Sequence, residues 1–263
     1  MKILYIGDIM AIPGQKAVAK ILSRIKKEYQ PDFVIAQAEN IDAEGKGPGK
    51  QDIEAMQKAG VDFFSGGNHS LRGKKSAELY EDKSAPVLRP ANLKDAPGKG
   101  WQIVETPSGK VLVASILGQT VGRPLELRNP LEETDKILEE TAKEDLVARI
   151  INFHGDFSSE KKVFGYYLDG RVSAVIGDHW HIPSADAMVL PKGTAHITDV
   201  GMCGTLHSSL GVKSQVIIDR WKTGKPSRNI IEEDGPLQFS AVLVKVNTHT
   251  GLADSIEHIQ RTI

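Results

Sequence analysis

The chain has 263 residues, which is enough for one large hydrophobic core or two modest ones. Its 40 per cent hydrophobic and 25 per cent charged residues are typical of a globular domain. The 33 basic and 34 acidic side chains leave a net charge of −1, so bulk charge does not favour a nucleic acid as the main partner. Because no repeat or composition break marks a linker, we expect one domain over residues 1–263.

The compartment can be predicted from three absences in the sequence. The apolar run after Met1 and Lys2 is too short for the core of a signal peptide. No segment approaches the roughly 20 apolar residues that a membrane span needs. Cys203 is the one cysteine and cannot form an internal disulfide, which favours a reducing compartment. We therefore expect a cytoplasmic protein with no membrane partner.

Strands and helices alternate from the N-terminus onward. A pattern of apolar residues with helical spacing follows Pro13-Gly14 and stops before Pro31. The other early elements are strands over 3–8, 33–40 and 61–66, a glycine-rich loop over 44–49 and a helix from Gln51 to Gly60. This β-α-β-α-β order predicts parallel strands joined by right-handed crossovers, and therefore an α/β fold.

The second half is less regular. The predicted elements are a strand over 111–117, a long loop over 118–130, an acidic helix over 131–146, strands over 150–154 and 172–177, and a terminal hairpin of strands 239–247 and 253–263. The turn of the hairpin is expected at 248–251. We interpret residues 118–146 as a candidate insertion or lid.

Five of the apolar runs end in residues that can bind a metal. These residues are Asp8, Glu39, Asn40, Asn68, His69, His154, His179 and His181. In α/β sheets the chemistry lies just beyond the carboxyl ends of the strands, so one sheet edge would gather all of these side chains. Carboxylate and imidazole ligands in a cleft are typical of sites for two divalent cations. The pattern therefore predicts hydrolysis at phosphorus.

Each residue also has an ordinary structural explanation. Asp8 alone is more often a helix cap, and Asn68 alone is more often a turn residue. Any one of the eight histidines, taken alone, is more often structural or at the surface than functional. The loop over 45–49 lacks the Gly-Lys-Ser/Thr ending of a nucleotide-binding loop, and Cys203 lacks a partner pattern for covalent catalysis. The conjunction of five strand ends with compatible ligands outweighs these explanations.

The same motifs resemble a known family. The matching segments are Ile6-Gly7-Asp8, Glu39-Asn40, Gly67-Asn68-His69, Phe153-His154, Ser159-Glu160-Lys161, His179-Trp180-His181 and the stretch from Leu190-Pro191-Lys192-Gly193-Thr194 to Asp199-Val200-Gly201-Met202. The chain resembles the calcineurin-like metallophosphoesterases, and within them the bacterial 2′,3′-cyclic-nucleotide 2′-phosphodiesterases. The resemblance implies a four-layer αββα sandwich with two mixed β-sheets and the metals at one edge.

The resemblance also implies roles for the site residues. One metal would be held by Asp8, Glu39, Asn40 and His181, and the other by Glu39, Asn68, His154 and His179. Glu39 would bridge two divalent or transition-metal ions, and His69 would be the general acid that protonates the leaving oxygen after attack by a metal-bridging hydroxide. Met10 replaces a histidine ligand that is common in the superfamily, and the more oxygen-rich site favours iron or manganese over zinc.

The expected reaction is the opening of a small phosphodiester, a 2′,3′-cyclic nucleotide, to its 3′-monophosphate. Arg72, Asp178 and Trp180 depart from the usual pattern of this branch and alter the walls of the cleft, so they bear on substrate preference. Two alternatives stay open at this point. One is a phosphatase or nucleotidase of broader specificity, and the other is a regulatory RNA- or protein-binding module with a structural metal site. A homo-oligomer is compatible with the sequence.

Overall fold

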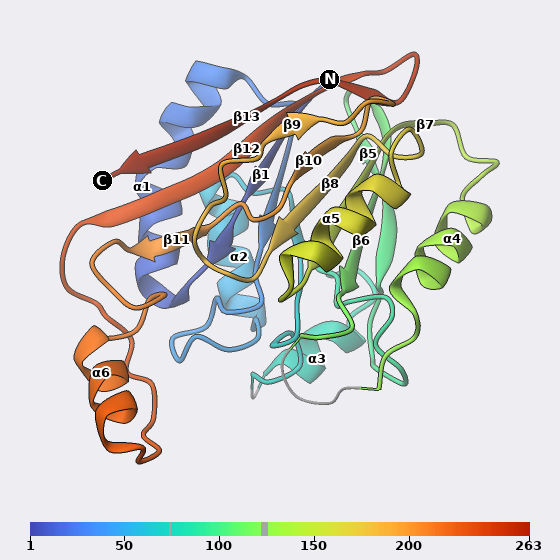
Figure 1. The fold of residues 1–263 in the computed structure, drawn as a ribbon. Helices are drawn as coiled ribbons and strands as arrows, with labels where there is room; N and C mark the ends of the chain where they lie inside the picture. The colour runs from blue at the N-terminus through green and yellow to red at the C-terminus, as the bar shows by residue number, and fades with distance from the viewer. Residues whose placement is uncertain (74, 122–125) are drawn as a thin grey trace.

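The structure is a computed structural model that describes residues 1–73, 75–121 and 126–263. Within these ranges two mixed β-sheets pack face to face, with helices on both outer sides (Figure 1). Part of the candidate lid over 118–146, residues 122–125, lies outside the described residues. No helix among the described residues is long and apolar enough to cross a membrane.

The first sheet has the strand order β2-β11-β12-β1-β3-β4, and β13 pairs with β12. The strands are β1 (Lys2–Ile6), β2 (Asp8–Ile9), β3 (Phe33–Gln37), β4 (Phe63–Ser65), β11 (Met202–Thr205), β12 (Leu237–Asn247) and β13 (Leu252–Thr262). β1, β3 and β4 run parallel, which confirms the predicted parallel pairing. The hairpin of β12 and β13 turns at 248–251, as expected from the sequence.

The second sheet has the order β5-β6-β7-β8-β10-β9. The strands are β5 (Trp101–Thr106), β6 (Gly109–Leu117), β7 (Leu146–His154), β8 (Ala174–Asp178), β9 (Met188–Val189) and β10 (Ala195–Ile197). β6, β7, β8 and β10 are parallel. Their carboxyl ends therefore meet at one edge of this sheet.

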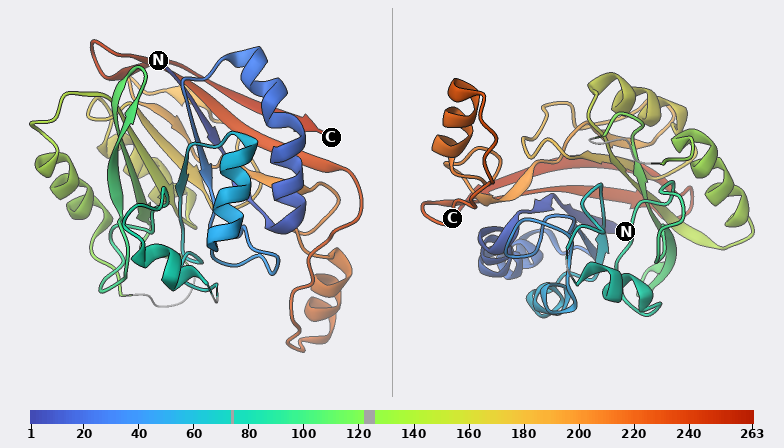
Figure 2. Two further views of the ribbon diagram at one scale, coloured as in Figure 1. Left: turned by 180° about the vertical axis from the view of Figure 1, so that it is seen from behind. Right: turned by 90° about the horizontal axis from the view of Figure 1, so that it is seen from below.

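Alternation along the strands builds the layers, because successive residues of a strand face opposite sides. Ile3 and Tyr5 of β1 pack into the cluster between the two sheets, while Leu4 and Ile6 face the helices α1 (Ala11–Tyr29) and α2 (Lys50–Ala59). On the second sheet, alternate residues of β6 and β7 face outward into a third cluster with α4 (Pro130–Glu140) and α5 (Ser158–Tyr167). Figure 2 shows the resulting order of helix, sheet, sheet and helix. The predicted four-layer αββα sandwich is confirmed.

One predicted helix has a different end. The sequence pattern indicates a helix over 131–146, but α4 ends at Glu140 and Leu146 begins β7. The hydroxyl of Thr141 donates a hydrogen bond to the carbonyl of Ile137 at 2.8 Å, which satisfies one of the free carbonyls at the helix end. Leu146 packs into the third cluster as a strand residue, so its apolar character reflects the core and not the helix.

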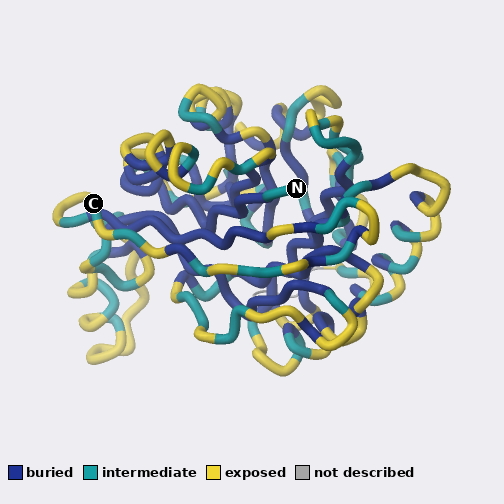
Figure 3. Tube along the Cα trace, turned by 90° about the horizontal axis from the view of Figure 1, so that it is seen from above, coloured by how far each residue is buried: buried dark blue, intermediate teal, exposed yellow. Residues whose placement is uncertain are grey.

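Two further helices remain, of which the first packs Leu79 and Tyr80 into the cluster that the first sheet forms with α1 and α2. α3 (Ser76–Glu81) follows the loop after β4, and α6 (Ser214–Thr223) projects from the body of the molecule (Figure 1). No residue of α6 is buried, and the tube is intermediate or exposed along this helix (Figure 3). Trp221, at its C-terminal end, is 83% exposed. The base of this arm is held by an apolar cluster of Met10, Met202 and Val212.

Candidate metal centre

The carboxyl ends of strands from both sheets converge on one region. Asp8 follows β1, the pair Glu39-Asn40 follows β3, and Asn68-His69 follows β4, all on the first sheet. His154 ends β7, and His179 and His181 follow β8, on the second sheet. The site therefore lies where the edges of the two sheets meet, and the contacts described below link all of the sequence-predicted residues into one cluster.

Glu39 is the centre of this cluster. Its side chain is only 1% exposed, and its Oε1 lies 3.3 Å from Nε2 of His154. The backbone N–H of His69 donates to Oε2 at 2.8 Å. One ligand atom each from Glu39, His154 and His179 lie within 4.8 Å of one another, an arrangement that can hold a metal ion. A carboxylate buried this deeply requires partners or a cation.

A second group surrounds Asp8. Nε2 of His181 lies 3.5 Å from Oδ2 of Asp8, and the amide nitrogen of Asn40 donates to the same oxygen at 2.9 Å. Oδ1 of Asp8 is buried and has no hydrogen-bond partner among the described residues. Burial raises the pKa of Asp8 above its usual range, although His181 opposes the shift. An unpartnered buried carboxylate oxygen beside an imidazole fits a cation-binding position.

The imidazole of His154 is fixed by a carboxylate on each side. Its Nδ1 lies 2.7 Å from Oδ1 of Asp178, so Nε2 is the nitrogen that faces Glu39 and the amide oxygen of Asn68, the latter at 2.9 Å. Burial alone would lower the pKa of His154, but the two carboxylates raise it to about 10. The ring is therefore strongly attracted to positive charge, whether a proton or a metal ion.

His179 contacts a residue that the sequence reasoning missed. Its Nε2 lies 2.9 Å from Oδ1 of Asp156, which comes two residues after His154 in the same strand-end loop. That short spacing is the signal that could have identified Asp156. Burial, followed by repulsion from His154, lowers the pKa of His179 to about 4, so the imidazole is neutral at pH 7. A neutral imidazole is the form that binds metals.

Among the four histidines of the cluster, His69 has the most exposed side chain. Its side chain is 28% exposed, and its Nδ1 lies 2.6 Å from Oδ1 of Asn40. The backbone N–H is used by Glu39, so the residue is held at two points. The remaining ring nitrogen, Nε2, is available for a ligand at the surface of the cluster.

Gly67 makes room for this cluster. A Cβ built at Gly67 would lie 2.2 Å from Oε2 of Glu39 and 2.6 Å from Cε1 of His154. Any other residue would therefore displace the two side chains at the heart of the site. Glycine at this position therefore lets the backbone approach the site closely.

The donor atoms of the clustered side chains are of the kinds that bind metal ions. The first group offers oxygens of Asp8 and Glu39 and the imidazole of His181, and the second offers Glu39 with the imidazoles of His154 and His179. The amide nitrogen of Asn40 donates to Oδ2 of Asp8 at 2.9 Å and to Oε1 of Glu39 at 3.1 Å. Rotation of this amide by 180° would present its oxygen to a cation and its nitrogen to His69.

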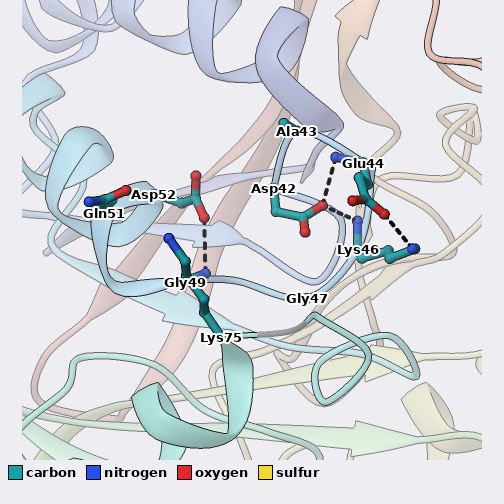
Figure 4. A pocket seen from close by; sticks show the side chains of 9 residues that line it. All are labelled: Asp42, Ala43, Glu44, Lys46, Gly47, Gly49, Gln51, Asp52 and Lys75. Atoms are coloured by element: carbon teal, nitrogen blue, oxygen red, sulfur yellow. Dashed lines mark hydrogen bonds and ion pairs between the residues drawn. The ribbon is translucent and has the colours of Figure 1, made fainter.

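A pocket of about 340 Å³ lies elsewhere, between the loop over 42–49 and the start of α2 (Figure 4). Asp42 accepts the backbone N–H groups of Glu44 and Lys46, and Asp52 accepts that of Gly49. These hydrogen bonds shape the glycine-rich loop. Because none of the expected metal ligands lines this pocket, it is separate from the candidate metal centre.

Hydrolases of the metallophosphoesterase type combine a two-sheet sandwich with carboxylate, amide and imidazole donors at its edge, and this protein is one of them. The chain belongs to the YmdB-like protein family, whose model matches residues 4–259. This confirms the resemblance found in the sequence.

Individual relatives match over almost their whole length. The chain is 37% identical over 260 residues to a Bacillus subtilis protein described as 2′,3′-cyclic-nucleotide 2′-phosphodiesterase, covering 98% of this chain and 96% of that protein. A structure titled a novel phosphatase from Mycoplasma pneumoniae superposes with a TM-score of 0.92 at 30% identity, covering 100% of this chain and 93% of the other. A hypothetical protein of Thermus thermophilus gives a TM-score of 0.90 at 37% identity, covering 100% of this chain and 99% of the other.

Proposed function

We propose that this chain is a metal-dependent phosphodiesterase that opens 2′,3′-cyclic nucleotides to nucleoside 3′-monophosphates. The observation that carries the proposal is the convergence of Glu39, His154 and His179, whose ligand atoms lie within 4.8 Å of one another at a two-sheet edge. The Bacillus subtilis relative, described as a 2′,3′-cyclic-nucleotide 2′-phosphodiesterase, supports this choice of substrate.

The chain would hold two cations that share Glu39. Asp8, Glu39, Asn40 and His181 form one set of ligands, and Glu39, Asn68, His154 and His179 form the other. The first set is rich in oxygen and the second has two imidazoles, which together favour iron or manganese. Bound cations would supply a nucleophilic hydroxide from water and neutralise the charge that develops on the phosphate.

His69 would deliver the proton that the leaving oxygen needs. Nδ1 of His69 donates to the amide oxygen of Asn40 at 2.6 Å. If the Asn40 oxygen turns to a cation, the amide nitrogen would donate to Nδ1 instead, and Nε2 would then carry the proton. The 28% exposure of the side chain leaves Nε2 accessible to a substrate that enters from solvent. Asn40 binds the ring of His69 and Glu39 binds its backbone N–H, so the side chain keeps one orientation. A general acid requires such a fixed orientation towards the leaving oxygen.

In this reaction a water molecule adds across the P–O2′ bond of the cyclic phosphodiester. The oxygen of water forms the new bond to phosphorus, the P–O2′ bond breaks, and O2′ leaves with a proton from Nε2 of His69. The proton that the water loses replaces the one that His69 gives up. The product is the 3′-monophosphate. Product identity depends on which ribose oxygen lies opposite the attacking oxygen and within reach of His69.

Chromatography of the products from 2′,3′-cyclic AMP tests the proposal. We expect 3′-AMP from metal-loaded enzyme and no turnover after thorough chelation, with recovery when Mn²⁺ is added. Formation of mainly 2′-AMP would contradict the regiochemistry. Rapid hydrolysis of phosphomonoesters without turnover of the cyclic substrate would assign the site to a phosphatase, and full activity without metal would contradict the whole proposal.

A further inference from the structure

The segment Asp178 to His181 carries two ligand candidates in an unusual backbone conformation. His179 has a φ of +112° and His181 has a φ of +63°, in a region that residues with a Cβ rarely adopt. Trp180, between them, donates its indole N–H to the carbonyl of Asp156 at 2.7 Å. Strained residues of this kind persist only when the surrounding structure holds them.

The buried side chain of Lys161 contacts this segment at several points. The ammonium of Lys161, on α5, donates to the backbone carbonyl of Asp178 at 2.8 Å and to Oδ2 of Asp199 at 2.8 Å. It also lies 4.0 Å from the centre of the Trp180 ring. Oδ2 of Asp199 accepts the backbone N–H of Trp180 at 2.8 Å as well. Lys161 and Asp199 are both 0% exposed.

We propose that Lys161 is a positioning residue, which with Asp199 holds the strained 178–181 segment so that His179 and His181 face the metal centre. The inference rests on the proposed function for the role of the two histidines. The argument is geometric. Every polar partner that the structure gives the Lys161 ammonium is either part of this segment or the carboxylate that binds its Trp180 N–H.

The burial of the pair makes a purely stabilising role a poor explanation. Two charges removed from water pay a large desolvation cost, and replacing such a pair with apolar residues is often neutral for stability. Geometry is what this pair supplies, because the ammonium reaches a carbonyl, an indole face and a carboxylate at once. The contacts of Lys162, the next residue, are of a different kind. It pairs with Asp186 at 3.1 Å and is 33% exposed, so it serves as a matched control.

The test compares Mn²⁺ binding to metal-free protein by calorimetry for the unaltered chain, Lys161→Met, the double variant Lys161→Met with Asp199→Asn, and Lys162→Met. The double variant removes both charges, so no unpaired charge is left buried. We expect about 10–100-fold weaker binding in both Lys161 variants, the usual effect of losing a residue that orients a ligand, and no change in Lys162→Met.

Trp180→Leu is the fourth variant and covers the case in which Lys161 variants do not fold, since it leaves the ion pair intact. It should also weaken Mn²⁺ binding, because the segment loses its indole contacts. A folded double variant or a folded Trp180→Leu variant that binds Mn²⁺ as tightly as the unaltered chain would overturn the inference. If the unaltered chain itself binds no Mn²⁺, the proposed function fails first, so the two failures are distinguishable.

Discussion

Nδ1 of His154 lies 2.7 Å from Oδ1 of Asp178, and both side chains are 0% exposed. The other carboxylate oxygen of Asp178 accepts hydrogen bonds from Tyr5, Gln37 and Asn152 at 3.1, 2.8 and 2.7 Å. The side-chain amide oxygen of Gln37 in turn accepts the backbone N–H groups of Ala38 and Glu39. Asp178 thus connects the two sheets directly behind the candidate metal ligands.

Asp178→Asn tests this connection. The variant keeps the shape of the side chain, but it loses the charge that orients His154 and turns one acceptor into a donor that faces other donors. We expect metal affinity to fall by about 10–100-fold and the metal-free protein to lose about 1–3 kcal/mol of stability. Metal titration and urea unfolding measure the two effects. Asp135→Asn, which alters an exposed pair with Arg171, should leave metal affinity unchanged.

His69→Ala should separate proton donation from metal binding. Its metals should remain, while the rate on 2′,3′-cyclic AMP should fall by about 10²–10⁴-fold because the alkoxide needs a proton. Bis-p-nitrophenyl phosphate should be affected much less, since nitrophenolate leaves without one. An equal loss on both substrates would instead make His69 a ligand or a positioning group.

Glu39→Ala and His179→Ala should differ in metal content. The proposed bridging position of Glu39 means that its removal weakens both sites, whereas His179 serves one. Elemental analysis of anaerobically purified protein should give about two metal ions per chain for the unaltered protein. We expect the lowest content in Glu39→Ala, with hydrolysis abolished in both variants. Equal metal content in the two variants would argue against a bridging glutamate. His207→Ala, altering an exposed histidine, is the control.

His196 should make stability depend on pH without involving the metal centre. It is 1% exposed, and burial, together with nearby Lys162, lowers its pKa to about 4. Below pH 6.5 the unfolded chain binds a proton that the folded chain excludes. The neutral ring therefore makes its full contribution to the free energy of unfolding above pH 6.5. This contribution, about 3 kcal/mol, is lost as the pH falls towards 4. His196→Leu should remove this part of the slope in urea unfolding of metal-free protein. If the stability of His196→Leu depended on pH as steeply as that of the exposed-site variant His249→Ala, the assignment would be contradicted.

The strand ends that carry the candidate ligands could be predicted, because the apolar pattern that marks each strand lies within that strand. β1, β3, β4, β7 and β8 are short apolar runs that stop at a polar residue, and that signal is local. The expected donors converge because parallel strands share one carboxyl edge. Helix α5 was not predicted, since Val163 and Tyr166 are exposed and break the apolar periodicity. Strands β10 and β11 were also missed, because they are set by their pairing with β8 and β2.

Residues whose importance comes only from a distant partner could not be predicted. Lys161 stands in the Ser159-Glu160-Lys161 segment that matches the family, but no local pattern gives it a role, which becomes visible only through Asp199, 38 positions away. Asp178 was noticed as a departure from the family pattern, but its four hydrogen-bond donors come from β1, β3 and β7. Contacts of this kind depend on how the two sheets face each other, which no local pattern encodes.

The division of donors between the sheets has a mechanical consequence. Asp8, Glu39 and Asn68 belong to the first sheet, while His154, His179 and His181 belong to the second. A cation held by both groups would act as a removable cross-link at the open edge of the sandwich. Binding to the folded state alone raises its stability with ligand concentration. In the metal-free protein the two sheets should therefore separate first at this edge, which hydrogen exchange of the backbone amides would detect. Added metal should slow the amide exchange of β3 and β8 together.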